Sequence, residues 1–136
     1  IRRAWPSYQM PSPSGAPTVT TTPAAEPLIR ADWLQPGQHL DLIGAYRPDM
    51  READDTALQR ARVFVDSFDT TIGHIGEIEK PLQSGAITRG DILADHYQPD
   101  LMARKLDDDI TLFKNGGGAH MDLMTSHYIL QQFHAG

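Results

Sequence analysis

Short runs of β-branched and apolar residues, separated by helical or turn-rich stretches, constrain the fold of this chain more than any other feature. Such runs occupy residues 18–22, 39–44, 62–66 and 109–113. The run at 62–66 has an apolar centre that suits a strand covered on both faces, as the strands of parallel sheets are. Strands that alternate with helical connections predict βα units and a mostly parallel sheet. The expected fold class is therefore α/β.

Helical segments are expected between and after these strands. We predict helices at 54–60, 70–84 and 119–133, and single turns or short helices at 33–34 and 91–94. Asp54 or Asp55 can cap the first helix, because a carboxylate there accepts the free amides of the first turn. Glycines weaken the second prediction, and Pro81 is expected to bend that helix. The third segment fits an amphipathic helix packed on the core.

The first seventeen residues have a different composition. Prolines and serines recur there without helical or strand periodicity, and each proline removes a backbone donor. We expect an irregular Pro/Ser-rich arm at 1–17 and one domain at 18–136. The sequence opens on Ile1 rather than on Met, so either residues ahead of it were removed or the sequence is a fragment.

Composition excludes several classes of function. A formal net charge of -6 without a Lys/Arg block argues against nucleic acid, since phosphate binding needs clustered cations. No apolar run approaches the roughly 20 residues that cross a bilayer, so we expect no membrane span. The absence of Cys removes disulfides and thiolate zinc sites, and it is compatible with a cytoplasmic location.

We also expect no metal site. His120, His127 and His134 recur every seven residues on the last predicted helix, which places them about 10 Å apart, too far to share an ion. The acidic run at 107–109 precedes a strand without convergent ligands and fits a polar loop better than a cation site.

Four segments carry a resemblance to a known family. They are, in order, VTTTP with EPL (19–28), LDLIGA through RE (40–52), RVFVDS followed by GEI (62–78), and DITLF ahead of NGG (109–117). Together they resemble the C-terminal half of the ornithine cyclodeaminase/mu-crystallin family, over residues 18–133. The loop pattern is most similar to the members that reduce cyclic ketimines such as pyrroline-2-carboxylate.

The resemblance implies a partial Rossmann fold: a doubly wound, mostly parallel sheet that lacks its first βαβ half and ends in a long C-terminal helix. The family binds NAD or NADP and acts on small cyclic imino or amino acids. Its G-x-G-x-x-G phosphate loop has no counterpart here, because Gly116-Gly117-Gly118 is too compact and follows the last strand. We therefore expect a fragment or truncated member that is not a competent NAD(P)-dependent oxidoreductase alone. An ornithine cyclodeaminase fragment, or a non-catalytic binding or assembly protein from an interrupted gene, are the alternatives.

Site residues follow from the same resemblance. Ligands of open parallel sheets sit beyond the carboxyl ends of the strands. At these ends the family pattern assigns cofactor-binding roles to Thr22, Ile43, Gly44, Ala45, Asn115 and Gly117, and a substrate-binding role to Gly116. The alternatives are a turn threonine before a proline, a glycine that only ends a strand, and a glycine connector before a helix.

Tyr46 departs from the cyclodeaminase pattern. It stands where the cyclodeaminating members carry an aspartate that transfers protons, so it is the candidate catalytic residue. A tyrosine with an unperturbed pKa of about 10 can donate a proton or a hydrogen bond but is a poor base at neutral pH. Met50 also replaces a cofactor-contacting lysine of the cyclodeaminases. The pattern favours cyclic ketimine reduction, although Tyr46 could simply pack on its loop.

The first predicted strand, at 19–22, indicates that the chain pairs with another chain. Without the first half of a Rossmann sheet, the strand at 19–22 loses the neighbour that it would have in mid-sheet, and an unpaired strand invites pairing with another chain. We therefore predict a homodimer.

Overall fold

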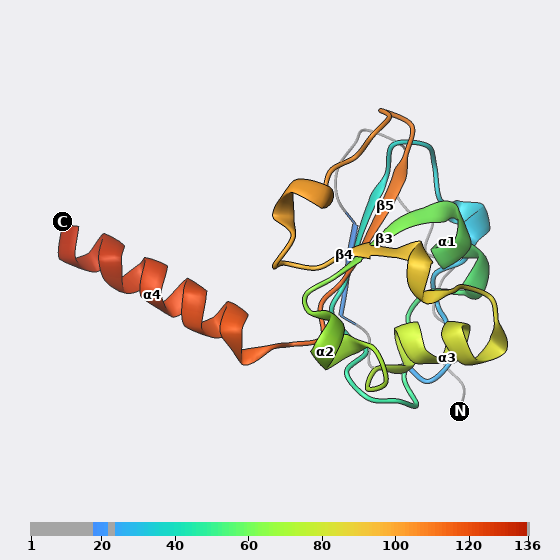
Figure 1. Ribbon diagram of the computed structural model, residues 1–136, viewed down its shortest axis with the longest axis horizontal. Helices are drawn as coiled ribbons and strands as arrows, with labels where there is room; N and C mark the ends of the chain where they lie inside the picture. Colours follow the sequence, from blue (N-terminus) through green and yellow to red (C-terminus); the bar gives the residue numbers. More distant parts are fainter. Residues whose placement is uncertain (1–17, 22–23, 136) are drawn as a thin grey trace, which may run out of the picture.

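A five-stranded sheet organises the part of the chain that the computed structural model describes, residues 18–21 and 24–135 (Figure 1). The predicted arm at 1–17 and the candidate Thr22 lie outside these residues. The strands are β1 (Thr18–Thr20), β2 (His39–Leu42), β3 (Ala61–Val65), β4 (Ile92–Ala94) and β5 (Ile110–Lys114). Their order in the sheet is β1-β2-β5-β3-β4, and every pairing is parallel, as the sequence predicts.

The last strand of the chain lies in the middle of the sheet. β5 pairs with β2 on one side and with β3 on the other, so that Lys114 is in register with both Leu42 and Val65. Because the strands are parallel, their carboxyl ends meet at one edge. The segments that follow β2, β3 and β5 are therefore neighbours.

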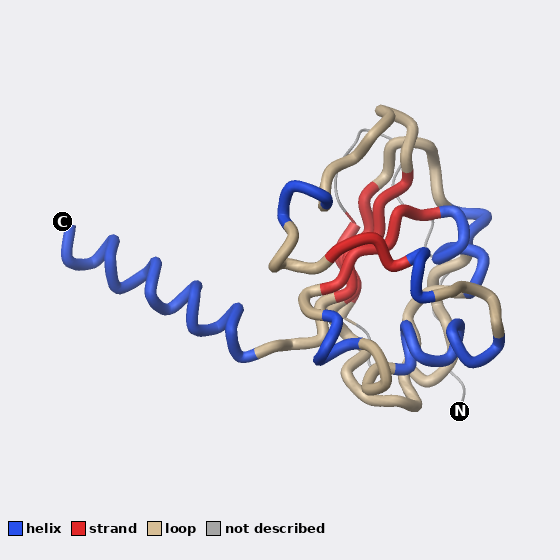
Figure 2. Tube along the Cα trace, viewed as in Figure 1, coloured by secondary structure: helices blue, strands red, loops and turns tan. Residues whose placement is uncertain are grey.

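The core lies on one face of the sheet. Alternate strand residues such as Leu40, Val63 and Leu112 are buried there against Leu58 and Ile78. These last two side chains belong to the helices α1 (Asp55–Arg60) and α3 (Gly76–Ser84), which cover that face together with the short helix η1 (Ala31–Trp33) (Figures 1 and 2). The remaining described helices are α2 (Phe68–Thr71), η2 (Arg89–Asp91), η3 (Pro99–Leu101) and α4 (Ala119–Ala135).

Most helix predictions are confirmed in place and type. Asp54 caps α1, since its carboxylate accepts from the Ala57 amide at 2.8 Å. The single helix expected over 70–84 is two helices, because the chain turns at Gly73 with a φ of 81°. Pro81 lies inside α3 and does not end it.

The prediction of a turn or helix over 91–94 is wrong. Only η2 ends there, and Ile92–Ala94 is an edge strand that pairs with β3 through Val63 and Phe64. Ile92 and Ala94 are buried whereas Leu93 is more exposed. Three alternating residues are too few to indicate a strand in the sequence. Ile92–Ala94 forms a strand because it pairs with β3.

The prediction that α4 packs on the core is also wrong. The helix extends away from the sheet, beyond the turn that follows β5 (Figures 1 and 2). Six of its large apolar side chains are between 53% and 79% exposed: Leu123, Met124, Tyr128, Ile129, Leu130 and Phe133. They are distributed around the helix rather than along one stripe, a pattern typical of helices that are buried on several sides. Sequence alone identifies the helix but not what covers it.

Candidate functional site

Two turns meet at the carboxyl edge of the sheet. The first follows β2 and contains Ile43, Gly44 and Ala45; the second follows β5 and spans 115–118. The Asn115 amide donates to the carbonyl of Leu42 at 3.0 Å, which ties the second turn to the end of β2. The structure thus brings together six of the seven residues assigned to ligand binding; the seventh, Thr22, is outside the described residues.

The two turns differ in how much of them a ligand could reach. Ile43 is 40% exposed and Gly44 is half-buried, whereas the Ala45 side chain is fully buried and packs with Met50 and Ile75. Ala45 can therefore offer only its backbone to a ligand. Met50, which stands at the position of the cofactor-contacting lysine in the cyclodeaminase pattern, is buried in this cluster and does not present its side chain to a ligand.

In the second turn, Gly117 provides the most open backbone. Its φ is 79°, and an added Cβ would meet nothing within 4 Å. Asn115 closes the turn, since its side-chain oxygen accepts from the Gly117 amide at 2.7 Å. At Gly116 a Cβ would lie 2.8 Å from Ile75 Cδ1 and 3.3 Å from the Asp66 oxygens, so a side chain here would have to displace Ile75 and crowd the Asp66 carboxylate.

A buried carboxylate supports the first turn. Glu52 is 1% exposed and accepts from the amides of Gly44 and Ala45, both at 3.0 Å. It also accepts from the Thr20 hydroxyl at 2.6 Å and pairs with the Lys114 ammonium at 3.2 Å. Sequence reasoning missed Glu52 and Lys114 as site residues.

A second buried carboxylate supports the other turn. Asp66 directly follows β3 and accepts from the amides of Gly116 and Gly118 at 3.0 and 3.4 Å. Its other oxygen accepts from the Thr71 hydroxyl at 2.7 Å and from the Ser67 amide at 2.8 Å. An acidic residue immediately after a buried strand is a sequence signal that could have identified Asp66 as a support of the turn.

Glu77 holds the backbone on which Glu52 is mounted. Its carboxylate accepts from the amides of Glu52 and Ala53 at 2.5 and 3.0 Å. Burial raises the pKa of Glu77 to about 7, while those two hydrogen bonds and the charges of Lys114 and Arg51 act in the opposite direction. Three acidic side chains thus hold the two turns from within the protein.

Tyr46 follows the first turn and is 60% exposed. The guanidinium of Arg47 lies 6.0 Å from the centre of its ring, and Arg47 is itself paired with Asp49 at 2.7 Å. The phenol is accessible to solvent and to a ligand. The predicted proton-transfer position therefore carries an exposed tyrosine and not a carboxylate.

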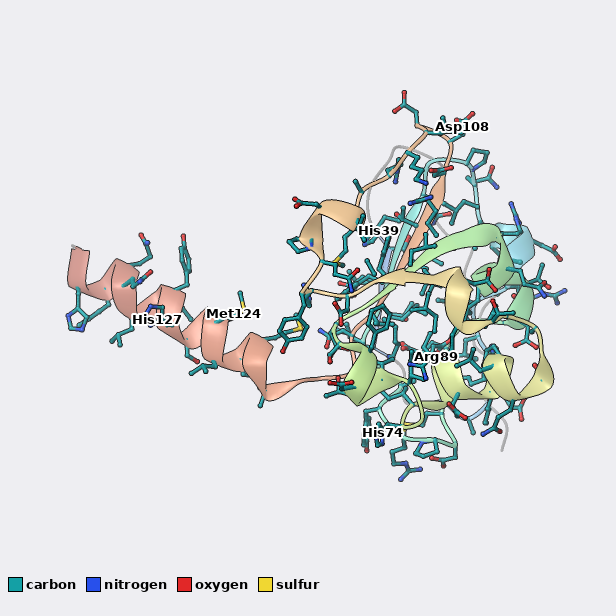
Figure 3. The ribbon with its side chains drawn as sticks, in the orientation of Figure 1. His39, His74, Arg89, Asp108, Met124 and His127 are labelled. Carbon is teal, nitrogen blue, oxygen red and sulfur yellow. The ribbon has the colours of Figure 1, made fainter. Side chains whose placement is uncertain are left out.

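No group of three His, Cys, Asp or Glu side chains among the described residues could hold a metal ion. His39, His74 and His127 come from separate parts of the molecule (Figure 3). On α4, His127 contacts Gln131 at 2.8 Å. Asp109 accepts from the amides of Lys105 and Leu106, both at 3.0 Å, as expected of a polar loop.

A cavity of about 280 Å³ lies elsewhere, on the sheet face opposite α1 and α3. It includes His39, Phe64 and Thr111 and shares no residue with the two turns. Across the described residues, no helix is long and apolar enough to cross a membrane.

The chemistry of the two turns fits the nicotinamide end of a dinucleotide. Ile43 offers an exposed apolar side chain, Gly44 has no side chain, and Gly117 leaves backbone open to a flat ring and its ribose. The turns carry no charged side chain of their own. The sequence has no G-x-G-x-x-G loop for the phosphates, so these residues fit only one end of the cofactor.

Comparison with known proteins identifies the family of the chain. Residues 16–136 match the model of the ornithine cyclodeaminase/mu-crystallin family. Delta(1)-pyrroline-2-carboxylate reductase of Paracoccus denitrificans (strain Pd 1222) is 53% identical over 113 residues, which make up 81% of this chain and 36% of that protein. The chain spans about a third of the length of the curated relatives it matches.

Two solved structures share the fold. An archaeal alanine dehydrogenase dimer with bound NAD has a TM-score of 0.69 and 33% identity, over 74% of this chain and 32% of that one. The Delta(1)-pyrroline-2-carboxylate reductase of Thermococcus litoralis, in complex with NADH and L-proline, has a TM-score of 0.67 and 30% identity, with the same coverage. The chain belongs to the ornithine cyclodeaminase/mu-crystallin family.

Proposed function

We propose that this chain forms the nicotinamide side of the active site of an NAD(P)-dependent reductase of cyclic imino acids. The observation that carries the proposal is the pair of adjacent, accessible and uncharged turns at the carboxyl ends of β2 and β5, each held by a buried carboxylate. The identity to a pyrroline-2-carboxylate reductase supports the choice of substrate class.

The reaction adds one hydride to the carbon and one proton to the nitrogen of a C=N bond. The reduced nicotinamide supplies the hydride when it is bound. In our proposal Ile43, Gly44 and Gly117 lie along the nicotinamide and its ribose, and the backbone at Gly116 faces the substrate. Tyr46 donates a hydrogen bond or a proton. A phenol suits this reduction better than cyclodeamination, which needs a base at the same position.

The proposal assigns residues 18–136 to the rear half of an NAD(P)-binding domain. Because the sequence lacks a phosphate loop, and the matched segment makes up only 36% of a relative of this class, we infer that other segments bind the phosphates and form most of the substrate pocket. The chain alone is then not a competent catalyst.

A chimera tests this proposal. Residues 18–136 replace the matching segment of the Paracoccus denitrificans reductase, which supplies the rest of the enzyme. We expect the chimera to oxidise NADH or NADPH when Delta(1)-pyrroline-2-carboxylate is added, and the isolated chain to show neither turnover nor micromolar cofactor binding. The unaltered reductase, and the same reductase with the segment deleted, are the controls.

Two results would contradict the proposal. A folded chimera that binds neither NADH nor NADPH would remove the cofactor assignment. Turnover by the isolated chain would remove the claim that it is incompetent alone.

We further propose that the isolated chain is a homodimer. β1 is an edge of the described sheet, so the outer backbone groups of Thr18–Thr20 have no neighbouring strand there. Exposed edges of this kind pair readily with another chain. We expect light scattering to give a mass near twice 15.1 kDa.

A charged residue at an edge blocks such pairing. Val19→Lys is therefore expected to yield the monomer, whereas Leu101→Lys, at a residue that is likewise 54% exposed, should leave the dimer intact. A wild-type chain that stays monomeric at high concentration would contradict the dimer.

A further inference from the structure

A fully buried ion pair lies directly beneath the turn that follows β2. Lys114 is 0% exposed and Glu52 is 1% exposed, with 3.2 Å between Nζ and Oε1. Lys114 Nζ also donates to the carbonyl of Leu42 at 3.0 Å. The pair therefore joins the carboxyl ends of β5 and β2 at the place where the two turns begin.

Burying two charges is costly, and a well-packed apolar pair commonly serves stability as well or better. Stability alone therefore does not explain why the charges of Lys114 and Glu52 are buried here. The other hydrogen bonds of Glu52 indicate a more specific use. The oxygen that meets Lys114 also accepts from the amides of Gly44 and Ala45, and the second oxygen accepts from the Thr20 hydroxyl.

Lys114 and Thr20 fix the carboxylate from β5 and β1, the two strands that flank β2, while Glu77 fixes its backbone from α3. The carboxylate in turn orients two consecutive amides of the turn. If the Lys114–Glu52 pair served only to connect β5 to the segment that follows β2, Glu52 would need no hydrogen bonds to Gly44 and Ala45. Three elements of the fold are used to set the conformation of Gly44 and Ala45.

We propose that Glu52, held in place by Lys114, is a positioning residue that fixes the Gly44–Ala45 turn in the conformation that receives the nicotinamide ribose. This inference rests on the proposed function and names residues for it that touch neither cofactor nor substrate. Glu52 acts through the backbone of the turn, and Lys114 acts through Glu52.

The first measurement needs no cofactor and uses the 136-residue chain. Amide hydrogen exchange at Gly44 and Ala45 is compared in the wild type, Glu52→Gln, Lys114→Met and the double variant. Both amides should be protected in the wild type and exchange faster in all three variants, while amides of α1 remain protected. The double variant removes both charges, so it preserves folding if one single variant does not fold. Glu26→Gln and Lys105→Met, at exposed residues, are the matched controls.

The second measurement uses the chimera described above and gives its dissociation constant for NADH, or for NADPH in place of NADH throughout if the wild-type chimera binds NADPH more tightly. Losing hydrogen bonds to a charged group predicts about a ten-fold or greater weakening in Glu52→Gln and in the double variant. The controls should bind as the wild type does. A positioning role also predicts that the KM for NADH rises more than kcat falls.

The outcomes separate the two proposals. If the wild-type chimera binds NADH and the folded variants bind it equally well, the positioning role is overturned and the proposed function stands. If amide exchange at the turn is unchanged in the variants, the positioning role is likewise overturned. A wild-type chimera that folds but binds neither NADH nor NADPH overturns the proposed function and this inference with it.

Discussion

Gly76→Ala is expected to destabilise the protein by about 3 kcal/mol, the upper range for forcing one methyl group into a closed site. A Cβ at this position would collide with the carbonyl oxygen of Pro48 and would lie 2.6 Å from that of Met50. Both obstacles are backbone atoms, and the Gly76 amide is bound to the Arg47 carbonyl at 2.9 Å, so the loop cannot simply rotate aside. Alanine gains at most about 1 kcal/mol of helix propensity over glycine, which does not offset the collision.

Urea unfolding of the chain measures this effect. Gly90→Ala is the matched control, because a Cβ there would meet only the Thr88 hydroxyl at 3.7 Å, an ordinary contact. That control should stay within about 0.5 kcal/mol of the wild type. If Gly76→Ala unfolds at the wild-type urea concentration, the 47–50 loop is not packed against α3 as described.

The sheet could be predicted because its strands carry a local signal. Each of the runs at 39–44, 62–66 and 109–113 contains enough apolar residues to be recognised, and the helices between them require parallel pairing. Ile92–Ala94 has too few residues for such a signal, since its strand character comes from pairing with β3. The placement of α4 was equally out of reach, because apolar residues indicate that a helix will be covered without indicating by what.

The turns of the site could be predicted, but their supports could not. Ile43–Ala45 and Asn115–Gly117 follow strands, and the ends of parallel strands are where ligands bind. Glu52 lies in a polar, charged stretch, Glu77 fits the polar positions of an amphipathic helix, and Lys114 could be taken for the polar end of a strand. Only the tertiary fold brings these charges together and excludes water from them. Acids and bases are rarely buried, so a sequence-based expectation assigns them to the surface.

The stability of the protein is expected to fall between pH 4.5 and 7 because of Glu77. Its pKa is raised from 4.5 to about 7 by burial, so in this range the folded protein retains a proton that the unfolded chain has lost. A group with a raised pKa stabilises the fold at low pH, and that contribution disappears as the pH rises through the folded-state pKa. Each pKa unit corresponds to about 1.4 kcal/mol, so the whole shift corresponds to about 3 kcal/mol.

The difference in unfolding free energy between the wild type and Glu77→Gln isolates this contribution, because other titrating groups contribute equally to both proteins. Glutamine loses one acceptor for the amides of Glu52 and Ala53 at every pH, which gives a constant offset. In addition to that offset, the unfolding free energy of the variant should rise by about 3 kcal/mol relative to that of the wild type between pH 4.5 and 8. Glu79→Gln, two residues along α3 and partly exposed, is the matched control for the loss of one carboxylate from this helix. A constant difference for Glu77→Gln would mean that the pKa of Glu77 is the same in the folded and unfolded protein, so that its two amide hydrogen bonds and the charges of Lys114 and Arg51 cancel the effect of burial.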